Sequence, residues 1–224
     1  MAFGLVQFAD RRDAGRKLAK ALLALNLHDP VILALPRGGV PLGLEVAQAL
    51  DAPLDLIMVR KIGAPGHAEY GIGAVVDGAN PQVVIDRAMA ETVGADESYL
   101  QRVLEQNVAE IDRRRIAYGV EDPIPIKGRT AIVVDDGIAT GNTAKAALKA
   151  IARSKPARII LAVPVAARDA LEALKPLCDE VICLHSPRAF QAVGVHYDDF
   201  GQTSDEEVIA LLRQANLSKN NSLS

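Results

Sequence analysis

Two adjacent carboxylates at the end of a predicted strand are the residues best placed to do chemistry. The apolar run 130–134 ends at Asp135 and Asp136, and a loop of small and hydroxyl residues leads into an Ala-rich helix. Backbone N–H groups at a helix N-terminus bind anions, because the helix dipole favours negative charge there. Carboxylates beside such a loop suit a ligand with both hydroxyls and phosphate, such as a phosphorylated ribose. An acidic turn with Asp136 as a helix cap would explain only part of this run.

A second candidate anion site follows an earlier apolar strand, expected over 31–35. Pro36 ends that strand, and Arg37, Gly38 and Gly39 come next. Two consecutive glycines expose N–H groups that can form an anion-binding concavity. The Arg37 guanidinium suits phosphate oxygens. A tight turn with a surface arginine is the alternative interpretation of these residues.

Two further segments carry residues suited to binding. The basic pair Arg60 and Lys61 begins a Gly- and Pro-rich stretch, which we expect to be a loop over 61–71. After the last predicted core strand, a loop holds three aromatic residues close together, Phe190, Tyr197 and Phe200. Such rings either stack on a planar ligand or pack their segment onto the domain.

The elements that must position these residues alternate along the chain. We expect strands over 31–35, 54–59, 72–76, 82–85, 130–134, 158–165 and 180–184. We expect helices over 10–25, 40–50, 86–92, 96–118, 143–154, 168–174 and 205–214. This alternation predicts an α/β fold, a Rossmann-like parallel sheet with helices on both faces. Such sheets bind ligands at the carboxyl ends of their strands, where the candidate motifs lie.

The organisation that we predict is a single domain over 1–224 with one insertion. The long helix 96–118 is charged on most of its circumference, which predicts an exposed helical lid or arm over about 78–120. The arginines 113–115 are expected to lie on the solvated face of that helix. The polar tail 218–224 is expected to be disordered.

Composition excludes several classes of protein. The formal net charge is −3, which argues against nucleic acid as a partner. No apolar run is long enough to span a bilayer, and the first residues do not resemble a secretory signal, so we expect a cytoplasmic protein without a membrane partner. The spacing of Cys178 and Cys183 fits neither a redox pair nor half a zinc site, which favours reduced core thiols. A homodimer stays open.

The stretch 133–143 resembles the signature of the type I phosphoribosyltransferases, in which apolar residues precede two acids, mostly apolar positions and a Thr/Ser-Gly-x-Thr/Ser pattern. The resemblance implies that Asp135 and Asp136 face the ribose hydroxyls of 5-phosphoribosyl 1-pyrophosphate. Gly137 departs from the family pattern, where a branched apolar residue is usual, and this predicts a looser cradle. The residues that the resemblance assigns to the 5-phosphate are Ala139, Thr140, Gly141, Asn142 and Thr143.

The other motifs resemble parts of the same family. The loop with Arg37, Gly38 and Gly39 is similar to its pyrophosphate loop, and the segment with Arg60 and Lys61 resembles the mobile catalytic loop of adenine phosphoribosyltransferases. The resemblance thus implies catalytic roles for Asp135, Asp136, Lys61 and Arg37. It places the acceptor in a hood that contains Phe190, Tyr197 and Phe200. It also implies Mg²⁺, held mainly by substrate oxygens and in part by Asp135 or Asp136.

The function implied is transfer of a phosphoribosyl group to a nitrogen acceptor, a nucleobase or similar ring, with release of pyrophosphate. The substrates would be small molecules. The motif 199–207, together with the glycine loop near the start, is similar to bacterial phosphoribosyltransferase-domain proteins over about residues 8–213. One alternative is a regulatory protein that senses the donor or binds nucleic acid, and another is hydrolysis of the donor or of a nucleotide with water as the acceptor. The hood sequence does not identify the acceptor.

Overall fold

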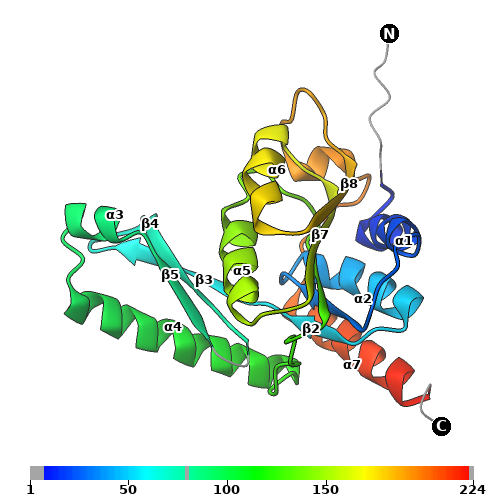
Figure 1. The fold of residues 1–224 in the computed structure, drawn as a ribbon, viewed down its shortest axis with the longest axis horizontal. Helices are drawn as coiled ribbons and strands as arrows, with labels where there is room; N and C mark the ends of the chain where they lie inside the picture. The colour runs from blue at the N-terminus through cyan, green and yellow to red at the C-terminus, as the bar shows by residue number, and fades with distance from the viewer. Residues whose placement is uncertain (1–7, 79–80, 222–224) are drawn as a thin grey trace.

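The core of the protein is a five-stranded parallel sheet (Figure 1). The computed structural model describes residues 8–78 and 81–221. The strand order is β2-β1-β6-β7-β8. The strands are β1 (Pro30–Ala34), β2 (Leu54–Leu56), β6 (Thr130–Val134), β7 (Arg158–Val165) and β8 (Glu180–His185).

Helices cover both faces of this sheet, which confirms the predicted fold class (Figure 1). Alternate residues of each strand point to opposite faces, so that Ile132 and Val134 join one apolar cluster and Ala131 and Val133 join the other. The first cluster includes residues of α1 (Arg11–Leu22), α2 (Gly39–Leu50) and α7 (Asp205–Asn221). The second includes residues of α5 (Asn142–Arg153) and α6 (Arg168–Leu174). Burial on both faces explains why these strands are almost wholly apolar.

The strand order creates a crevice between β1 and β6. After β1 the chain continues to its neighbour on one side, β2, and after β6 it continues to its neighbour on the other, β7. Open α/β sheets bind ligands at such a switch point, beyond the carboxyl ends of the strands. Ala34 and Val134 are register partners, and the Leu35 N–H donates to the Val134 carbonyl at 2.9 Å. The glycine loop and the acidic loop therefore leave the sheet at the same level.

An arm projects from the core (Figure 1). It contains a three-stranded antiparallel sheet in the order β3-β4-β5, and two helices. Helix α4 begins after the cap Asp96 and ends at Tyr118, before the cap Gly119, whose φ of 69° favours glycine, so the predicted helix 96–118 is confirmed. The elements are β3 (Val59–Ala64), β4 (His67–Val76), β5 (Gln82–Ile85), α3 (Arg87–Thr92) and α4 (Glu97–Tyr118).

The structure corrects three expectations about these segments. The loop expected over 61–71 is instead the β3–β4 hairpin, whose two-residue turn includes Gly66 with a φ of 74°. The strand expected over 54–59 ends at Leu56, and its last residue begins the arm sheet, so the projecting part begins before residue 78 and is not only helical. Helix α7 continues to Asn221, so disorder from residue 218 is wrong for 218–221, and residues 222–224 lie outside the described part.

A buried ion cluster joins the arm to the core. The Arg115 guanidinium of α4 donates to Asp55 of β2 and to Asp77 after β4, at 3.0 Å in each case, and all three side chains are at most 4% exposed. Asp55 also accepts the N–H groups of Leu56 and Ile124. The expectation that Arg115 lies on the solvated face of its helix is therefore wrong. The spacing of charged residues along a helix does not show that one of them pairs with a carboxylate on a distant strand.

This cluster makes stability depend on pH. Burial raises the pKa of Asp77 from 3.8 to about 7, although Arg115 opposes the rise. Between these values the folded protein retains a proton that the unfolded chain has lost, so this group lowers the free energy of unfolding as pH rises from about 4 to 7. We expect the free energy of unfolding of the wild type, measured in urea, to fall over this pH range. The same measurement on Asp77→Asn should lack this part of the fall, because asparagine does not titrate. Parallel curves over this range would contradict the assignment.

Candidate functional site

The two carboxylates of the acidic loop lie at the carboxyl end of β6, as predicted, and both are partly buried. The Asp136 carboxylate accepts a hydrogen bond from the Arg11 side chain, with 2.8 Å between Nε and Oδ2. The Asp136 N–H donates to the Asp135 carboxylate at 2.9 Å. Arg11 belongs to the first turn of α1 and was missed in the sequence, because a surface arginine 125 positions away gives no local signal of this contact.

Electrostatics make this acidic pair an unfavourable place for two negative charges. Burial raises the pKa of Asp135, and the neighbouring charge of Asp136 raises it further. Burial also raises the pKa of Asp136, while the hydrogen bond and the charge of Arg11 lower it. A bound cation or a set of ligand hydroxyls would therefore stabilise the ionised pair.

The loop 139–143 has the form of an anion cradle. Gly141 takes a φ of 75° and precedes the first residue of α5, so the first N–H groups of that helix face outward from its end. Ala139, Thr140 and Thr143 are exposed. Within the described residues, we find no hydrogen-bond acceptor for the backbone N–H groups of 139–143, and these groups remain available to a ligand.

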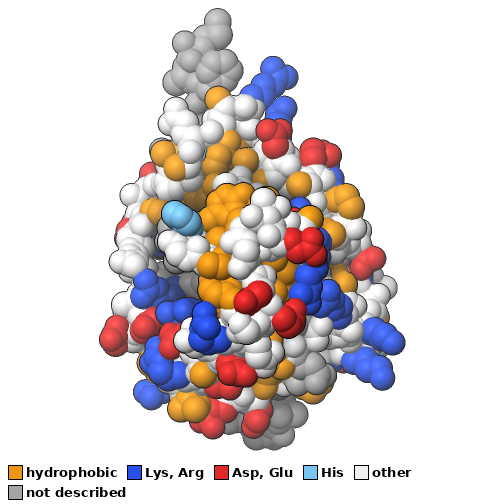
Figure 2. Space-filling view, turned by 90° about the vertical axis from the view of Figure 1, so that its left-hand side faces the viewer, with side chains coloured by type: hydrophobic (Ala, Val, Ile, Leu, Met, Phe, Trp, Pro, Cys, Tyr) orange, Lys and Arg blue, Asp and Glu red, His pale blue; other side chains and the backbone are white. Residues whose placement is uncertain are grey.

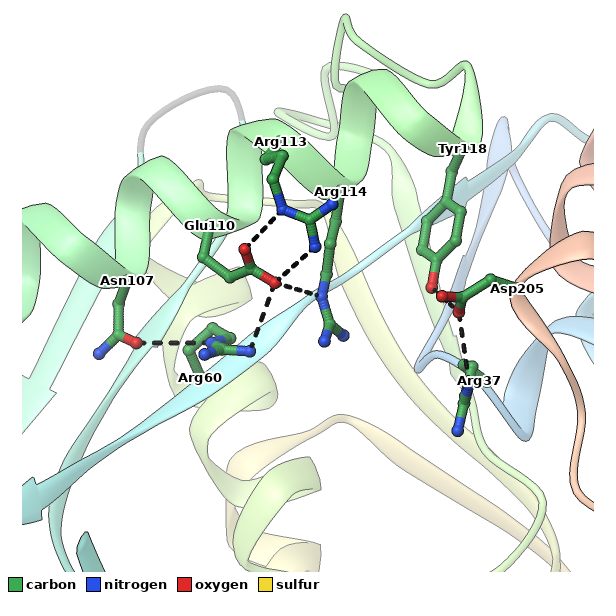
Figure 3. A network of polar contacts seen from close by, with 8 residues as sticks. All are labelled: Arg37, Arg60, Asn107, Glu110, Arg113, Arg114, Tyr118 and Asp205. Carbon is green, nitrogen blue, oxygen red and sulfur yellow. Dashed lines mark hydrogen bonds and ion pairs between the residues drawn. The ribbon is translucent and has the colours of Figure 1, made fainter.

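The glycine loop approaches the acidic loop closely. A Cβ at Gly38 would lie 2.1 Å from Asp136 Oδ2, and a Cβ at Gly39 would lie 2.5 Å from the Val134 carbonyl oxygen. Both positions therefore require glycine for packing. The Gly39 N–H donates to the Leu35 carbonyl at 2.9 Å, so this group is already engaged, contrary to the predicted anion-binding pair of amides. The Arg37 side chain is 36% exposed and lies 3.5 Å from Asp205 (Figure 3).

The arm carries the other predicted basic residues. Arg60 contacts Asn107 and Glu110 of α4, with 3.4 Å to the Asn107 amide oxygen (Figure 3). Lys61 is the next residue of β3, points to the opposite face and is exposed. No contact joins either side chain to the acidic loop among the described residues. A catalytic role for Lys61 stays a prediction that requires movement of the hairpin.

The predicted hood packs against the acidic loop. A Cβ at Gly137 would lie 2.4 Å from Val193 Cγ1, so the hood occupies the space that a branched residue would fill. The Tyr197 hydroxyl donates to the Asp136 carbonyl at 2.5 Å, and its ring is buried against Phe8 and Phe200. This position gives Tyr197 a packing role. The Arg11 guanidinium covers the ring of Phe200 at 3.9 Å.

Histidines in the hood were missed as candidates. The rings of His185 and His196 lie 5.3 Å apart, and Phe190 stacks on His196. Four buried atoms of this region have no hydrogen-bond partner in the described part of the chain: His185 Nε2, Ser186 Oγ and both ring nitrogens of His196. Buried polar atoms without partners are rare and indicate a functional role or bound water. The burial of these atoms without hydrogen-bond partners is evident only from the tertiary structure and has no signal in the sequence.

Charge on the arm side of the molecule is mixed. Figure 2 shows acidic and basic side chains next to one another across the lower half of this face, around an apolar patch near the centre. Such a distribution lacks the single-sign field that attracts polyanions at long range. No helix in the part of the chain that the structure describes has the length and apolar character required to cross a bilayer.

The parallel sheet, with an acidic pair and an anion cradle at its switch point, defines the type I phosphoribosyltransferase fold. A family model described as "Phosphoribosyl transferase domain" matches residues 7–199, and the chain belongs to this family. Two proteins of Mycobacterium tuberculosis are each 44% identical to this chain over 211 residues. They are "Putative phosphoribosyl transferase MT0597" of strain CDC 1551 and "Putative phosphoribosyl transferase Rv0571c" of strain H37Rv. The match covers 93% of this chain and 47% of each relative, so the chain spans about half their length.

A solved structure is also similar. The crystal structure of TT1426 from Thermus thermophilus has 43% sequence identity and a TM-score of 0.81. The similarity covers 93% of this chain and 98% of that chain. The similarity to this solved structure therefore extends over most of the chain.

Proposed function

We propose that this chain transfers the phosphoribosyl group of 5-phosphoribosyl 1-pyrophosphate to a nitrogen of an acceptor. The observation that carries the proposal is the position of the Asp135–Asp136 pair beside the available N–H groups of 139–143. The carboxylates suit the hydroxyls of a ribose, and the N–H groups suit its 5-phosphate. Membership of the family supports the same donor.

In the proposed reaction, the bond between C1 of the ribose and the pyrophosphate oxygen breaks, and its electron pair leaves with pyrophosphate. The acceptor nitrogen supplies the pair for the new bond to C1 and loses its proton to solvent or to a nearby base. Positive charge develops on the ribose ring as the leaving group departs. Asp135 and Asp136 stabilise that charge, and Arg37 stabilises the departing pyrophosphate.

The donor set also fits Mg²⁺, which prefers oxygen ligands. Asp135 and Asp136 would contribute carboxylate oxygens, and the cation would offset the crowding of charge that raises the pKa of Asp135. Among the described residues, no group of three or more His, Cys, Asp or Glu side chains could hold a metal ion. Most ligands would thus come from the donor and water. When bound, Mg²⁺ would supply charge neutralisation to the pyrophosphate.

The acceptor side of the proposed site is the hood. Phe190 and Phe200 are partly exposed and stay candidates for stacking on a planar ring. The unpartnered nitrogens of His185 and His196 could meet the donor and acceptor groups of a heterocycle if the hood rearranges. These features support a polar nitrogen heterocycle as the acceptor.

The proposal is tested by donor binding and by turnover. We expect titration calorimetry with Mg²⁺ to detect binding of 5-phosphoribosyl 1-pyrophosphate, and a screen of nucleobases and small amines to reveal acceptor-dependent release of pyrophosphate. Binding without release for any acceptor would favour a donor-sensing protein. Release with no acceptor present would favour hydrolysis. The absence of donor binding would overturn the proposal.

A further inference from the structure

We propose that the arm carries a second oxyanion site, formed by Arg60, Arg113 and Arg114, in which Glu110 is an internal counter-ion that the ligand displaces. The site is distinct from the cradle at 139–143 and rests on the proposed function for the identity of its ligand. Arg60 comes from β3, and the other three residues come from α4. Figure 3 shows the three guanidinium groups around the single carboxylate.

The geometry resembles the recognition of a phosphate by arginines. Glu110 accepts from Arg113 Nε at 2.7 Å and from Arg114 Nε at 2.9 Å, and Arg60 Nη1 lies 3.9 Å from the same carboxylate. Three positive charges thus face one negative charge. Arginine forks bind tetrahedral oxyanions through several parallel hydrogen bonds, and a phosphate offers more oxygens and more charge than a carboxylate.

Spacing along α4 connects this cluster with the predicted pyrophosphate loop. Glu110, Arg114 and Tyr118 are four residues apart in turn, so they form one stripe that spans about 12 Å of helix. At its far end the Tyr118 hydroxyl donates to Asp205 at 2.6 Å, and Asp205 pairs with Arg37 (Figure 3). The stripe therefore runs from Arg60, Arg113 and Arg114 to Arg37. At the first end the arginines pair with Glu110, and at the other end Arg37 pairs with Asp205.

A ligand anion can displace the Glu110 carboxylate because the arginines that bind this carboxylate are accessible to solvent. The exposed fractions are 65% for Arg113, 41% for Arg114 and 35% for Arg60, and ion pairs with this exposure contribute little to stability. The surrounding arginines lower the pKa of Glu110 to about 2, so protonation does not release it near neutral pH. A ligand therefore has to displace the ionised Glu110 carboxylate by binding the arginines more strongly. The neighbouring Asn107 is buried, and its Nδ2 lacks a partner among the described residues.

The ligand is an oxyanion of the phosphate type, and two sources could supply it. One is the pyrophosphate group of the donor, if the arm moves toward the cradle. The other is a phosphate carried by the acceptor, bound while the donor occupies its own site. A simple stabilising role for the Arg113–Glu110–Arg114 pairs on the helix would require neither source.

The test compares Glu110→Gln with the matched variant Glu105→Gln, an exposed glutamate earlier in the same helix, by calorimetry on the full chain. We expect Glu110→Gln to bind inorganic pyrophosphate, or inorganic phosphate after saturation with the donor, roughly threefold to tenfold more tightly than wild type. Glu105→Gln should match wild type. Arg114→Gln should weaken the same binding, whereas Arg102→Gln should not.

The two probes distinguish the sources. Tighter binding of pyrophosphate to the ligand-free protein identifies the donor's leaving group, and tighter binding of phosphate only in the presence of donor identifies an anionic acceptor. If Glu110→Gln changes neither affinity while the protein binds donor, the arm site is refuted and the proposed function stands. If the donor does not bind but Glu110→Gln still tightens pyrophosphate binding, the proposed function fails and the arm site stands.

Discussion

Asp136→Asn is expected to lower phosphoribosyl transfer by a factor of about 10²–10³, by analogy with the cost of removing one hydrogen-bond donor that stabilises a transition state. Asparagine keeps the size of the side chain and can still accept the hydrogen bond from Arg11. It lacks the negative charge that would stabilise the ribose ring as pyrophosphate leaves. The initial rate of pyrophosphate release, with the acceptor that the screen identifies, measures this effect.

The control for this substitution is Asp122→Asn. Asp122 is exposed and lies in the connection between α4 and β6, so its replacement should leave the rate within about twofold of wild type. Thermal unfolding of both variants separates a catalytic loss from the lost ion pair with Arg11. Unchanged turnover of Asp136→Asn, with donor affinity like that of wild type, would remove Asp136 from the proposed mechanism.

Arg115→Met is expected to lower the free energy of unfolding by about 3–5 kcal/mol near neutral pH. The substitution leaves Asp55 and Asp77 buried without their counter-charge at the junction of arm and core. The loss should be smaller at acidic pH, because both carboxyl groups can then be protonated. Urea unfolding at about pH 5 and about pH 8, on either side of the raised pKa of Asp77, measures both effects.

Arg113→Met is the matched control because it lies two residues earlier in α4 and its side chain is 65% exposed. We expect a change within about 0.5 kcal/mol for this variant. If Arg115→Met unfolds at the same urea concentration as Arg113→Met, the buried cluster does not hold the arm to the core.

Much of the core was predictable because its signals are local. The apolar run before Asp135 and the small residues after it determine a strand, a turn and a helix start within one short stretch. The glycines after β1 were interpreted as an anion-binding concavity, and only the structure shows that Gly38 and Gly39 approach the acidic loop closely. Placement of the cradle followed from the general property of parallel sheets that their carboxyl ends share one edge.

The rest depended on contacts between distant parts of the chain. Arg11 meets Asp136 across 125 positions, and Arg115 meets Asp55 across 60. The hairpin over 61–71 was missed because its glycines resemble those of a loop, whereas antiparallel pairing of β3 with β4 makes these residues strands. Gly39 was assigned to anion binding because the sequence does not show which amides the start of α2 engages.

The contacts that both ends of the chain make around the acidic loop have a consequence for biosynthesis. Arg11 reaches Asp136 from the beginning of the chain and Tyr197 reaches it from near the end, and the Phe8 N–H pairs with the His196 carbonyl. A nascent polypeptide emerging from the ribosome can form β1 and β6 before residue 197 has been translated. The acidic loop therefore gains its contact with Tyr197 only after β1 and β6 have been made, and a polypeptide that stops before residue 197 would lack that contact even if these two strands had paired.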